Sequence, residues 1–190
     1  MEKKELKLKF GVFGKGSVGK TSIIKRLIYD RFVDDYDPAN EWEFLKKIIV
    51  DDKEIMINIL DTEGEDEYST IIESWIKFSQ GFILVYSVID RDSFKKINFW
   101  NEKIQNFLKN ENYPKILVGN KNDLITEKQV STEEGKELAN KLNCKFIETS
   151  AKNGENIKQL FYESCILLMK KEEKKEQKGK EKKKGKCFLM

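Results

Sequence analysis

The stretch Gly14-Lys15-Gly16-Ser17-Val18-Gly19-Lys20-Thr21 decides the fold of this chain. It fits the pattern G-x-x-x-x-G-K-[ST], in which the backbone amides of a glycine-rich loop converge on phosphate oxygens at the start of a helix. Apolar residues have the spacing of a strand over residues 6–13 and of a helix face over residues 23–28. The octapeptide therefore predicts a phosphate-binding loop between a strand and a helix, and not an ordinary glycine-rich turn.

The residue types of this loop suit the phosphates of a nucleotide. Its three glycines allow positive φ angles and a close approach of the backbone to a ligand. Lys20 supplies a point charge for the β and γ phosphates, and the Thr21 hydroxyl is a hard ligand for magnesium. We therefore expect all eight residues to bind the nucleotide.

The pattern of the remaining chain predicts the fold class. Continuous apolar runs at 82–86 and 116–118 are typical of strands buried on both faces of a parallel sheet. Apolar residues on either side of Asp51-Asp52-Lys53 indicate a β-hairpin, and helical spacing fills the segments between the other strands. This order predicts an α/β fold with a doubly wound, mostly parallel six-stranded sheet, in which one hairpin strand is antiparallel. A ligand then belongs at the carboxyl ends of the strands.

Length and charge indicate one domain with a basic tail. At 190 residues we expect one core, in a domain over 1–169, and a disordered tail over 170–190. The whole chain has a net charge of +3, and its tail carries +6 from ten lysines and four glutamates, so the remainder is mildly acidic at −3. This asymmetry argues against a nucleic-acid-binding domain and favours a tail that meets an anionic membrane. No apolar run has the length of a membrane span, so we expect the chain in the cytosol.

Three further tetrapeptides follow predicted strands. Asp61-Thr62-Glu63-Gly64 offers a carboxylate at a strand end and a glycine whose amide can face a terminal phosphate, which is what a magnesium nucleotide site needs. In Asn120-Lys121-Asn122-Asp123 the Asp carboxylate can accept two hydrogen bonds from the guanine edge, which adenine does not offer. Thr149-Ser150-Ala151-Lys152 has small side chains that leave backbone amides free for the guanine carbonyl. Their order at strand ends predicts a site for guanine nucleotide.

With these four motifs in this order, the chain resembles a Ras-type small GTPase, which is a P-loop NTPase with a small G domain. The resemblance covers residues 5–169, with an effector loop at about 36–44 and a switch II segment at about 61–78. It implies binding of GTP and GDP with Mg²⁺, hydrolysis of GTP, a monomeric state, and effector, exchange-factor and GTPase-activating partners. It implies catalytic roles for Lys20, Gly64 and Glu65 and magnesium binding by Thr21 and Asp61. The further nucleotide-binding residues that it implies are Phe32, Val33, Asp34, Tyr36, Asp61, Gly64, Asn120, Lys121, Asp123, Ser150, Ala151 and Lys152.

The chain departs from the family pattern where the third phosphate is sensed. Ala39 stands where the family carries the threonine that binds magnesium in the GTP state, although Asn40 offers an oxygen one residue further on. Glu65 replaces the glutamine that orients the attacking water, and a carboxylate cannot donate to phosphate as an amide does. Glu63 adds a negative charge. We expect slow hydrolysis, and a non-switching interaction protein that keeps the nucleotide as a structural ligand is the alternative.

Two features bear on partners and location. Trp42 stands where the family carries an acidic residue, and it either contacts the effector or packs partly buried under the switch. The ending Cys187-Phe188-Leu189-Met190 has the C-a-a-X form, and its final Met favours farnesylation of Cys187. One prenyl chain anchors only marginally, so the lysine-rich tail supplies the second signal. We expect the protein on the cytoplasmic face of the cell membrane.

Overall fold

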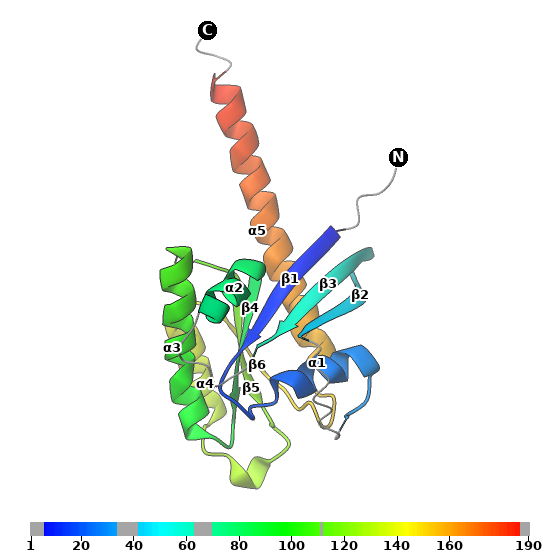
Figure 1. Ribbon diagram of the computed structural model, residues 1–190, viewed down its shortest axis with the longest axis vertical. Helices are drawn as coiled ribbons and strands as arrows, with labels where there is room; N and C mark the ends of the chain where they lie inside the picture. The colour runs from blue at the N-terminus through cyan, green and yellow to red at the C-terminus, as the bar shows by residue number, and fades with distance from the viewer. Residues whose placement is uncertain (1–5, 34–41, 63–69, 111, 187–190) are drawn as a thin grey trace.

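The computed structural model describes residues 6–33, 42–62, 70–110 and 112–186. Strands and helices alternate along the chain (Figure 1). In chain order they are β1 (Leu6–Phe13), α1 (Lys20–Tyr29), β2 (Glu43–Val50), β3 (Lys53–Asp61), α2 (Thr70–Phe78), β4 (Gly81–Ser87), α3 (Arg91–Leu108), β5 (Lys115–Asn120), the 3-10 turn η1 (Ile125–Glu127), α4 (Thr132–Lys141), β6 (Lys145–Glu148) and α5 (Ile157–Lys186).

The sheet confirms the predicted α/β topology. Its six strands lie in the order β2-β3-β1-β4-β5-β6. Among the strands of the described residues, only the hairpin pair β2 and β3 is antiparallel, with Phe44 opposite Ile59. The other neighbouring pairs are parallel, as where Val12 of β1 lies opposite Ile83 of β4. All residues of β4 and β5 are buried, which explains their unbroken apolar runs.

Helices cover the sheet from both sides and enclose two hydrophobic cores. α1 and α5 pack on one core, which includes Ile23 of α1 and Phe161 of α5. α2, α3 and α4 pack on the other, which includes Trp75 of α2 and Trp100 of α3. Alternate residues of β4 pack into the two cores, so this central strand stabilises both layers. Each fully buried aliphatic side chain contributes about 1.5–3 kcal/mol to the stability of the fold.

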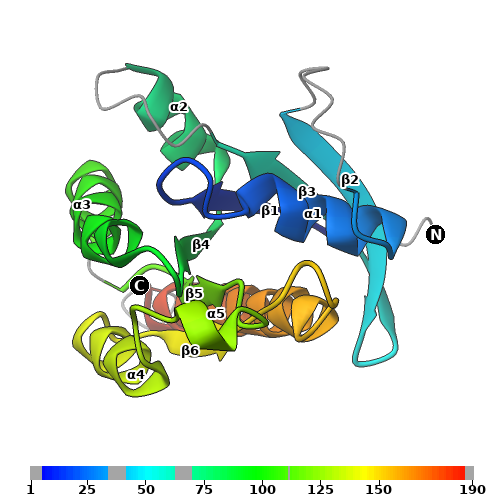
Figure 2. The same cartoon turned by 90° about the horizontal axis from the view of Figure 1, so that it is seen from below.

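The parallel strands bring the predicted motifs to one edge of the sheet. β1, β3, β4, β5 and β6 all end at this edge, which lies at the bottom of Figure 1 and faces the viewer in Figure 2. Helix α3 begins there with Asp90 as its N-cap, since Asp90 accepts hydrogen bonds from the amides of Asp92 and Ser93. The edge is therefore built from strand ends and helix starts, among them the capped start of α3.

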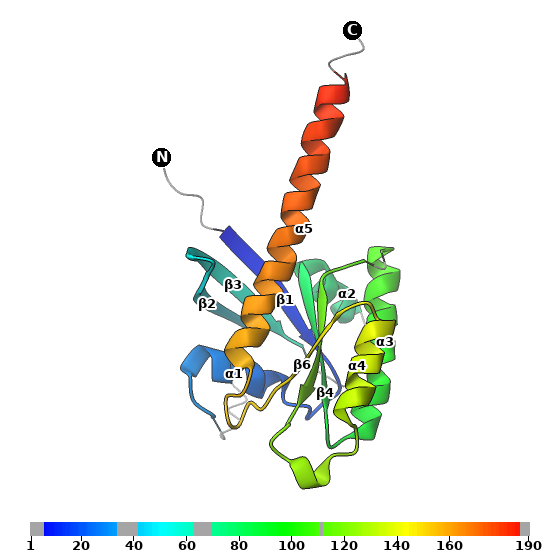
Figure 3. The same cartoon turned by 180° about the vertical axis from the view of Figure 1, so that it is seen from behind.

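Helix α5 runs past the boundary predicted between residues 169 and 170. Its backbone continues to Lys186 and projects beyond the sheet (Figures 1 and 3). Lysine and glutamate favour helix, but a helical segment without tertiary packing is marginally stable in water. The composition is thus compatible with a helix in the structure and with the disorder expected of the tail. Among the described residues, no helix is long and apolar enough to cross a membrane.

Candidate nucleotide-binding site

The loop between β1 and α1 has the tight geometry that its motif requires. Of its three glycines only Gly19 has a positive φ, at 94°, while Ser17 takes a second positive φ of 63°. Gly14 serves a different need, because a Cβ there would lie 2.2 Å from the carbonyl oxygen of Val85. Close packing against β4 thus excludes a side chain at Gly14.

Lys20 closes the loop from inside. Its side chain is buried, with the residue 6% exposed, and Nζ donates to the carbonyl oxygens of Gly14 at 3.1 Å and Lys15 at 3.0 Å. An ammonium group held by carbonyl oxygens at this loop is placed to meet the negative charge of a phosphate. The structure thus puts the predicted phosphate-binding lysine at the centre of the loop.

Thr21 and Asp61 meet although 40 positions separate them in the sequence. Thr21 lies in the first turn of α1, and its Oγ1 donates to Oδ2 of Asp61, at the end of β3, at 2.5 Å. A hydroxyl and a carboxylate oxygen are hard donors that suit Mg²⁺, which binds through one or two such groups together with phosphates. Among the described residues no cluster of three or more His, Cys, Asp or Glu forms a metal cage. The two oxygen donors of Thr21 and Asp61 fit the ligand preference of Mg²⁺.

Asn120 joins three of the predicted motifs. It is almost fully buried at the end of β5, and its Nδ2 donates to the Val18 carbonyl of the phosphate loop at 2.9 Å. Its Oδ1 accepts from Thr149 Oγ1 at 3.1 Å and from the Ala151 amide at 3.3 Å. In the structure this side chain holds loops together, whereas the resemblance implied only that it contacts the base.

The neighbouring residues extend this link. Lys121 lies across the phosphate loop, with Nζ donating to the Ser17 carbonyl at 2.8 Å. Ser150 Oγ donates to Asp123 Oδ1 at 2.6 Å and accepts from the Asn153 amide at 3.0 Å. One oxygen of the Asp123 carboxylate is thus fixed by a buried serine, which orients the carboxylate. The predicted base-binding motifs after β5 and β6 are therefore side by side.

Sequence reasoning missed two contacts of the site. Thr62 is buried, and its Oγ1 donates to the Val12 carbonyl at 2.7 Å, which fixes the chain directly after Asp61. Lys15 Nζ donates to Asp90 Oδ2 at 3.1 Å, which ties the phosphate loop to α3. An N-cap could have been predicted at Asp90 from the sequence Asp90-Arg91-Asp92-Ser93, but its partner across 75 positions could not.

The Asp90 carboxyl is held in its ionised form. Partial burial alone would raise its pKa, but the amide of Ser93 and the ammonium of Lys15 outweigh that effect and hold the pKa below the usual value. Asp90 therefore carries its negative charge at neutral pH, where it neutralises Lys15.

Other predicted residues are less enclosed or lie outside the described part. Phe32 is 37% exposed, Val33 is half-buried, and Lys152 is exposed, so the structure does not bring them into the hydrogen-bonded cluster around Asn120. Predictions that fall outside the described residues concern Asp34, Tyr36, Ala39, Asn40, Glu63, Gly64, Glu65 and Cys187.

Trp42 packs partly buried, which is one of the two alternatives predicted for it. Its ring lies 6.4 Å from that of Trp75 on α2, and it contacts the core beneath α2 and α3. Its carbonyl oxygen accepts from the Asp61 amide at 2.8 Å. The segment that leads into β2 is thus joined both to α2 and to the backbone of Asp61.

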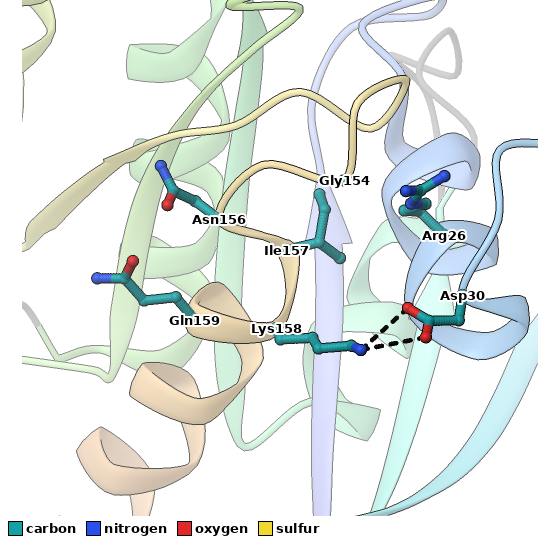
Figure 4. Close-up of a pocket in the computed structure, with 7 residues that line it drawn as sticks. All are labelled: Arg26, Asp30, Gly154, Asn156, Ile157, Lys158 and Gln159. Atoms are coloured by element: carbon teal, nitrogen blue, oxygen red, sulfur yellow. Dashed lines mark hydrogen bonds and ion pairs between the residues drawn. The ribbon is translucent and has the colours of Figure 1, made fainter.

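A separate surface pocket of about 320 Å³ lies between the end of α1 and the start of α5 (Figure 4). It is lined by Arg26, Asp30, Gly154, Asn156, Ile157, Lys158 and Gln159. The exposed pair Lys158–Asp30 borders it, with 3.0 Å between Nζ and Oδ1. None of the predicted nucleotide-binding residues lines this pocket, so the nucleotide site is identified by its motifs and contacts and not by a hollow.

Comparison with known proteins agrees with this geometry. The sequence model of the Ras family matches residues 9–170. Ras-like protein rasV of Dictyostelium discoideum is 41% identical over 172 residues, which cover 90% of this chain and 75% of that protein. Ras-like protein rasW of the same organism is 41% identical over 179 residues, or 94% of this chain and 83% of its own length. The chain therefore belongs to the Ras family, whose members are small GTPases that bind guanine nucleotides and act as signalling switches.

Proposed function

We propose that this protein is a magnesium-dependent GDP/GTP switch of the cell membrane that hydrolyses GTP slowly. The observation that carries the proposal is the 2.5 Å contact of Thr21 Oγ1 with Asp61 Oδ2 beside the loop that Lys20 bridges. It supports a phosphate cradle and a pair of oxygen ligands at one point. The motif after β5, whose Asn120 bonds the same loop, supports guanine as the base.

At the phosphate end, Lys20 would exchange its two carbonyl partners for oxygens of the β and γ phosphates. The amides of residues 16–21 would bind the remaining oxygens at the start of α1. Magnesium, when bound, neutralises charge on the β and γ phosphates. Thr21 would hold it through Oγ1, and Asp61 would contact it through water while accepting a hydrogen bond from the Thr21 hydroxyl.

At the base end, Asp123 would accept two hydrogen bonds from the edge of guanine. Ser150 supports this role because its hydroxyl orients the carboxylate, at 2.6 Å from Oδ1. Lys121 would cover the face of the ring with its alkyl stem while its ammonium holds the Ser17 carbonyl. The side chains of Phe32 and Lys152 are exposed, so a guanine base could cover them on binding.

Slow hydrolysis is proposed from residue chemistry. In the family pattern the groups at positions 64 and 65 meet the γ phosphate and the attacking water. Glu65 can accept a hydrogen bond from water but cannot donate one to the phosphate, and Glu63 adds repulsion. Ala39 removes one magnesium ligand of the GTP state, so the third phosphate would order its loop less firmly.

The same three residues favour a second function, an interaction protein that holds guanine nucleotide without switching. The two functions differ in how the protein responds to the third phosphate. We expect Mg²⁺ to bind more tightly with a non-hydrolysable GTP analogue than with GDP, as measured by titration of nucleotide-loaded protein. Equal affinities in the two states would instead support the non-switching protein.

We also propose attachment to the cytoplasmic face of the membrane through Cys187. Prenylation of this cysteine supplies one anchor, and lysines contribute about 1 kcal/mol each near an anionic leaflet. In cells, the variant Cys187→Ser should move from the membrane fraction to the cytosol, because the lysines alone bind weakly. A Cys187→Ser protein that stayed at the membrane would contradict this anchor.

A further inference from the structure

We propose that Lys15 and Asp90 are a positioning pair that holds the phosphate loop against the start of α3 and slows release of the bound nucleotide. The inference rests on the nucleotide binding proposed above. It concerns a side chain that the motif G-x-x-x-x-G-K-[ST] leaves unspecified. The contact joins Lys15 Nζ, in the loop after β1, to Asp90 Oδ2, in the turn between β4 and α3.

Lys15 connects directly to the phosphate-binding lysine. The Lys15 carbonyl accepts from Lys20 Nζ at 3.0 Å, while the Lys15 side chain reaches Asp90. A movement of Lys15 therefore shifts one of the oxygens that position the Lys20 ammonium. The tether acts on the nucleotide through Lys20 and not by contact with it.

Asp90 is a firm anchor. While Oδ2 binds Lys15, Oδ1 accepts from the amides of Asp92 at 2.9 Å and Ser93 at 3.1 Å. Ser93 Oγ in turn accepts from the amide of Ser87, the last residue of β4, at 3.0 Å. The carboxylate is thus fixed to a helix start and to the central strand.

The Lys15–Asp90 pair adds to the contacts that hold the phosphate loop in place. Asn120 and Lys121 hold its later part, through the carbonyls of Val18 and Ser17. Lys15–Asp90 holds its earlier part, from the turn between β4 and α3. The two side chains are 40% and 35% exposed, so the effect of the pair is modest, on the order of two- to fivefold in a rate.

Release of a fluorescent GDP analogue from the full chain, with Mg²⁺ present and excess GDP added, tests the pair. Lys15→Met and Asp90→Asn should each speed release about two- to fivefold. The double variant should be no faster than the faster single one, since both remove the same contact. Asparagine is also a good N-cap residue, so Asp90→Asn removes the negative charge but keeps the cap of α3. Lys15→Arg should retain slow release.

Salt and a matched control separate this tether from general destabilisation. Near 1 M salt, where screening acts over about 3 Å, the wild-type protein should approach the rate of the variants. Lys95→Gln removes the exposed pair of Lys95 with Asp92, at 3.4 Å on the same helix, and should leave release unchanged.

Additive effects of the two substitutions, or release that is unchanged or slower in Asp90→Asn, would overturn the inference. Lys15→Met provides the same test should Asp90→Asn fail to fold. A wild-type protein that does not bind the GDP analogue would refute the proposed function instead.

Discussion

Replacing Asn120 by alanine tests whether one buried amide organises the nucleotide site. The side chain makes three hydrogen bonds, to the Val18 carbonyl, the Thr149 hydroxyl and the Ala151 amide, at 2.9, 3.1 and 3.3 Å. A hydrogen bond contributes about 1 kcal/mol net, so Asn120→Ala should lower the free energy of unfolding by about 3 kcal/mol. The partners are themselves buried, so the loss is not recovered by water.

The same bonds hold the phosphate loop to the two base-binding loops. Without them, part of the order of these loops must be restored when the nucleotide binds. We therefore expect GDP affinity to fall at least tenfold. The limit is roughly 100-fold, which applies if the whole loss of about 3 kcal/mol from the three hydrogen bonds weakens the free energy of GDP binding. The assay is GDP dissociation with Mg²⁺ present, together with urea unfolding of the nucleotide-free protein.

Asn101 offers a matched control away from the site. It is a buried asparagine of α3 whose Oδ1 accepts from the Tyr113 hydroxyl at 2.7 Å. Asn101→Ala should lower stability by about 1 kcal/mol and leave GDP release unchanged. If Asn120→Ala lost stability but released GDP at the wild-type rate, the reasoning that Asn120 joins the nucleotide loops would be refuted.

Three further predictions follow from single contacts. Gly14→Ala places a Cβ 2.2 Å from the Val85 carbonyl, so it should reduce both thermal stability and GDP binding, and a wild-type melting temperature would contradict this packing. Thr21→Ala removes the hydroxyl 2.5 Å from Asp61, so chelation of Mg²⁺ should speed GDP release from the wild type but hardly from the variant, whereas Thr21→Ser should respond as the wild type does. The hydrogen bond from Arg91 lowers the pKa of Glu134 from 4.5 to about 2, so this ionised pair stabilises the fold above pH 4.5 and the contribution is lost as the pH falls towards 2. Glu134→Gln should therefore flatten the decline of unfolding free energy over that pH range, and an unchanged slope would exclude the pair as its source.

Periodicity and motif order were enough to predict the fold. The unbroken apolar runs of β4 and β5 reflect burial on both faces, and the turn Asp51-Asp52-Lys53 marked the antiparallel pair. Topology then required the phosphate loop and the motifs after β3, β5 and β6 to meet at one edge. These features depend on local pattern, which a sequence carries directly.

Contacts between distant side chains could not be predicted in the same way. Nothing near Lys15 in the sequence indicates Asp90, and nothing near Asn120 shows that its amide serves loops from β1 and β6. Which loop residues adopt a positive φ could not be predicted for a related reason. Ser17 and Gly19 have the positive φ angles. Position 14 requires glycine because the Val85 carbonyl leaves no room for a Cβ. Each case depends on packing between elements that are far apart in the chain.

Single-turnover hydrolysis of bound GTP tests the central claim most directly. Purified protein is loaded with GTP labelled at the γ phosphate, Mg²⁺ is added, and phosphate release is followed beside an ordinary Ras protein, with ATP loading as the control for base specificity. We predict that the protein retains GTP and not ATP and releases phosphate more slowly than the Ras protein. Retention of ATP, or phosphate release at the Ras rate, would contradict the account.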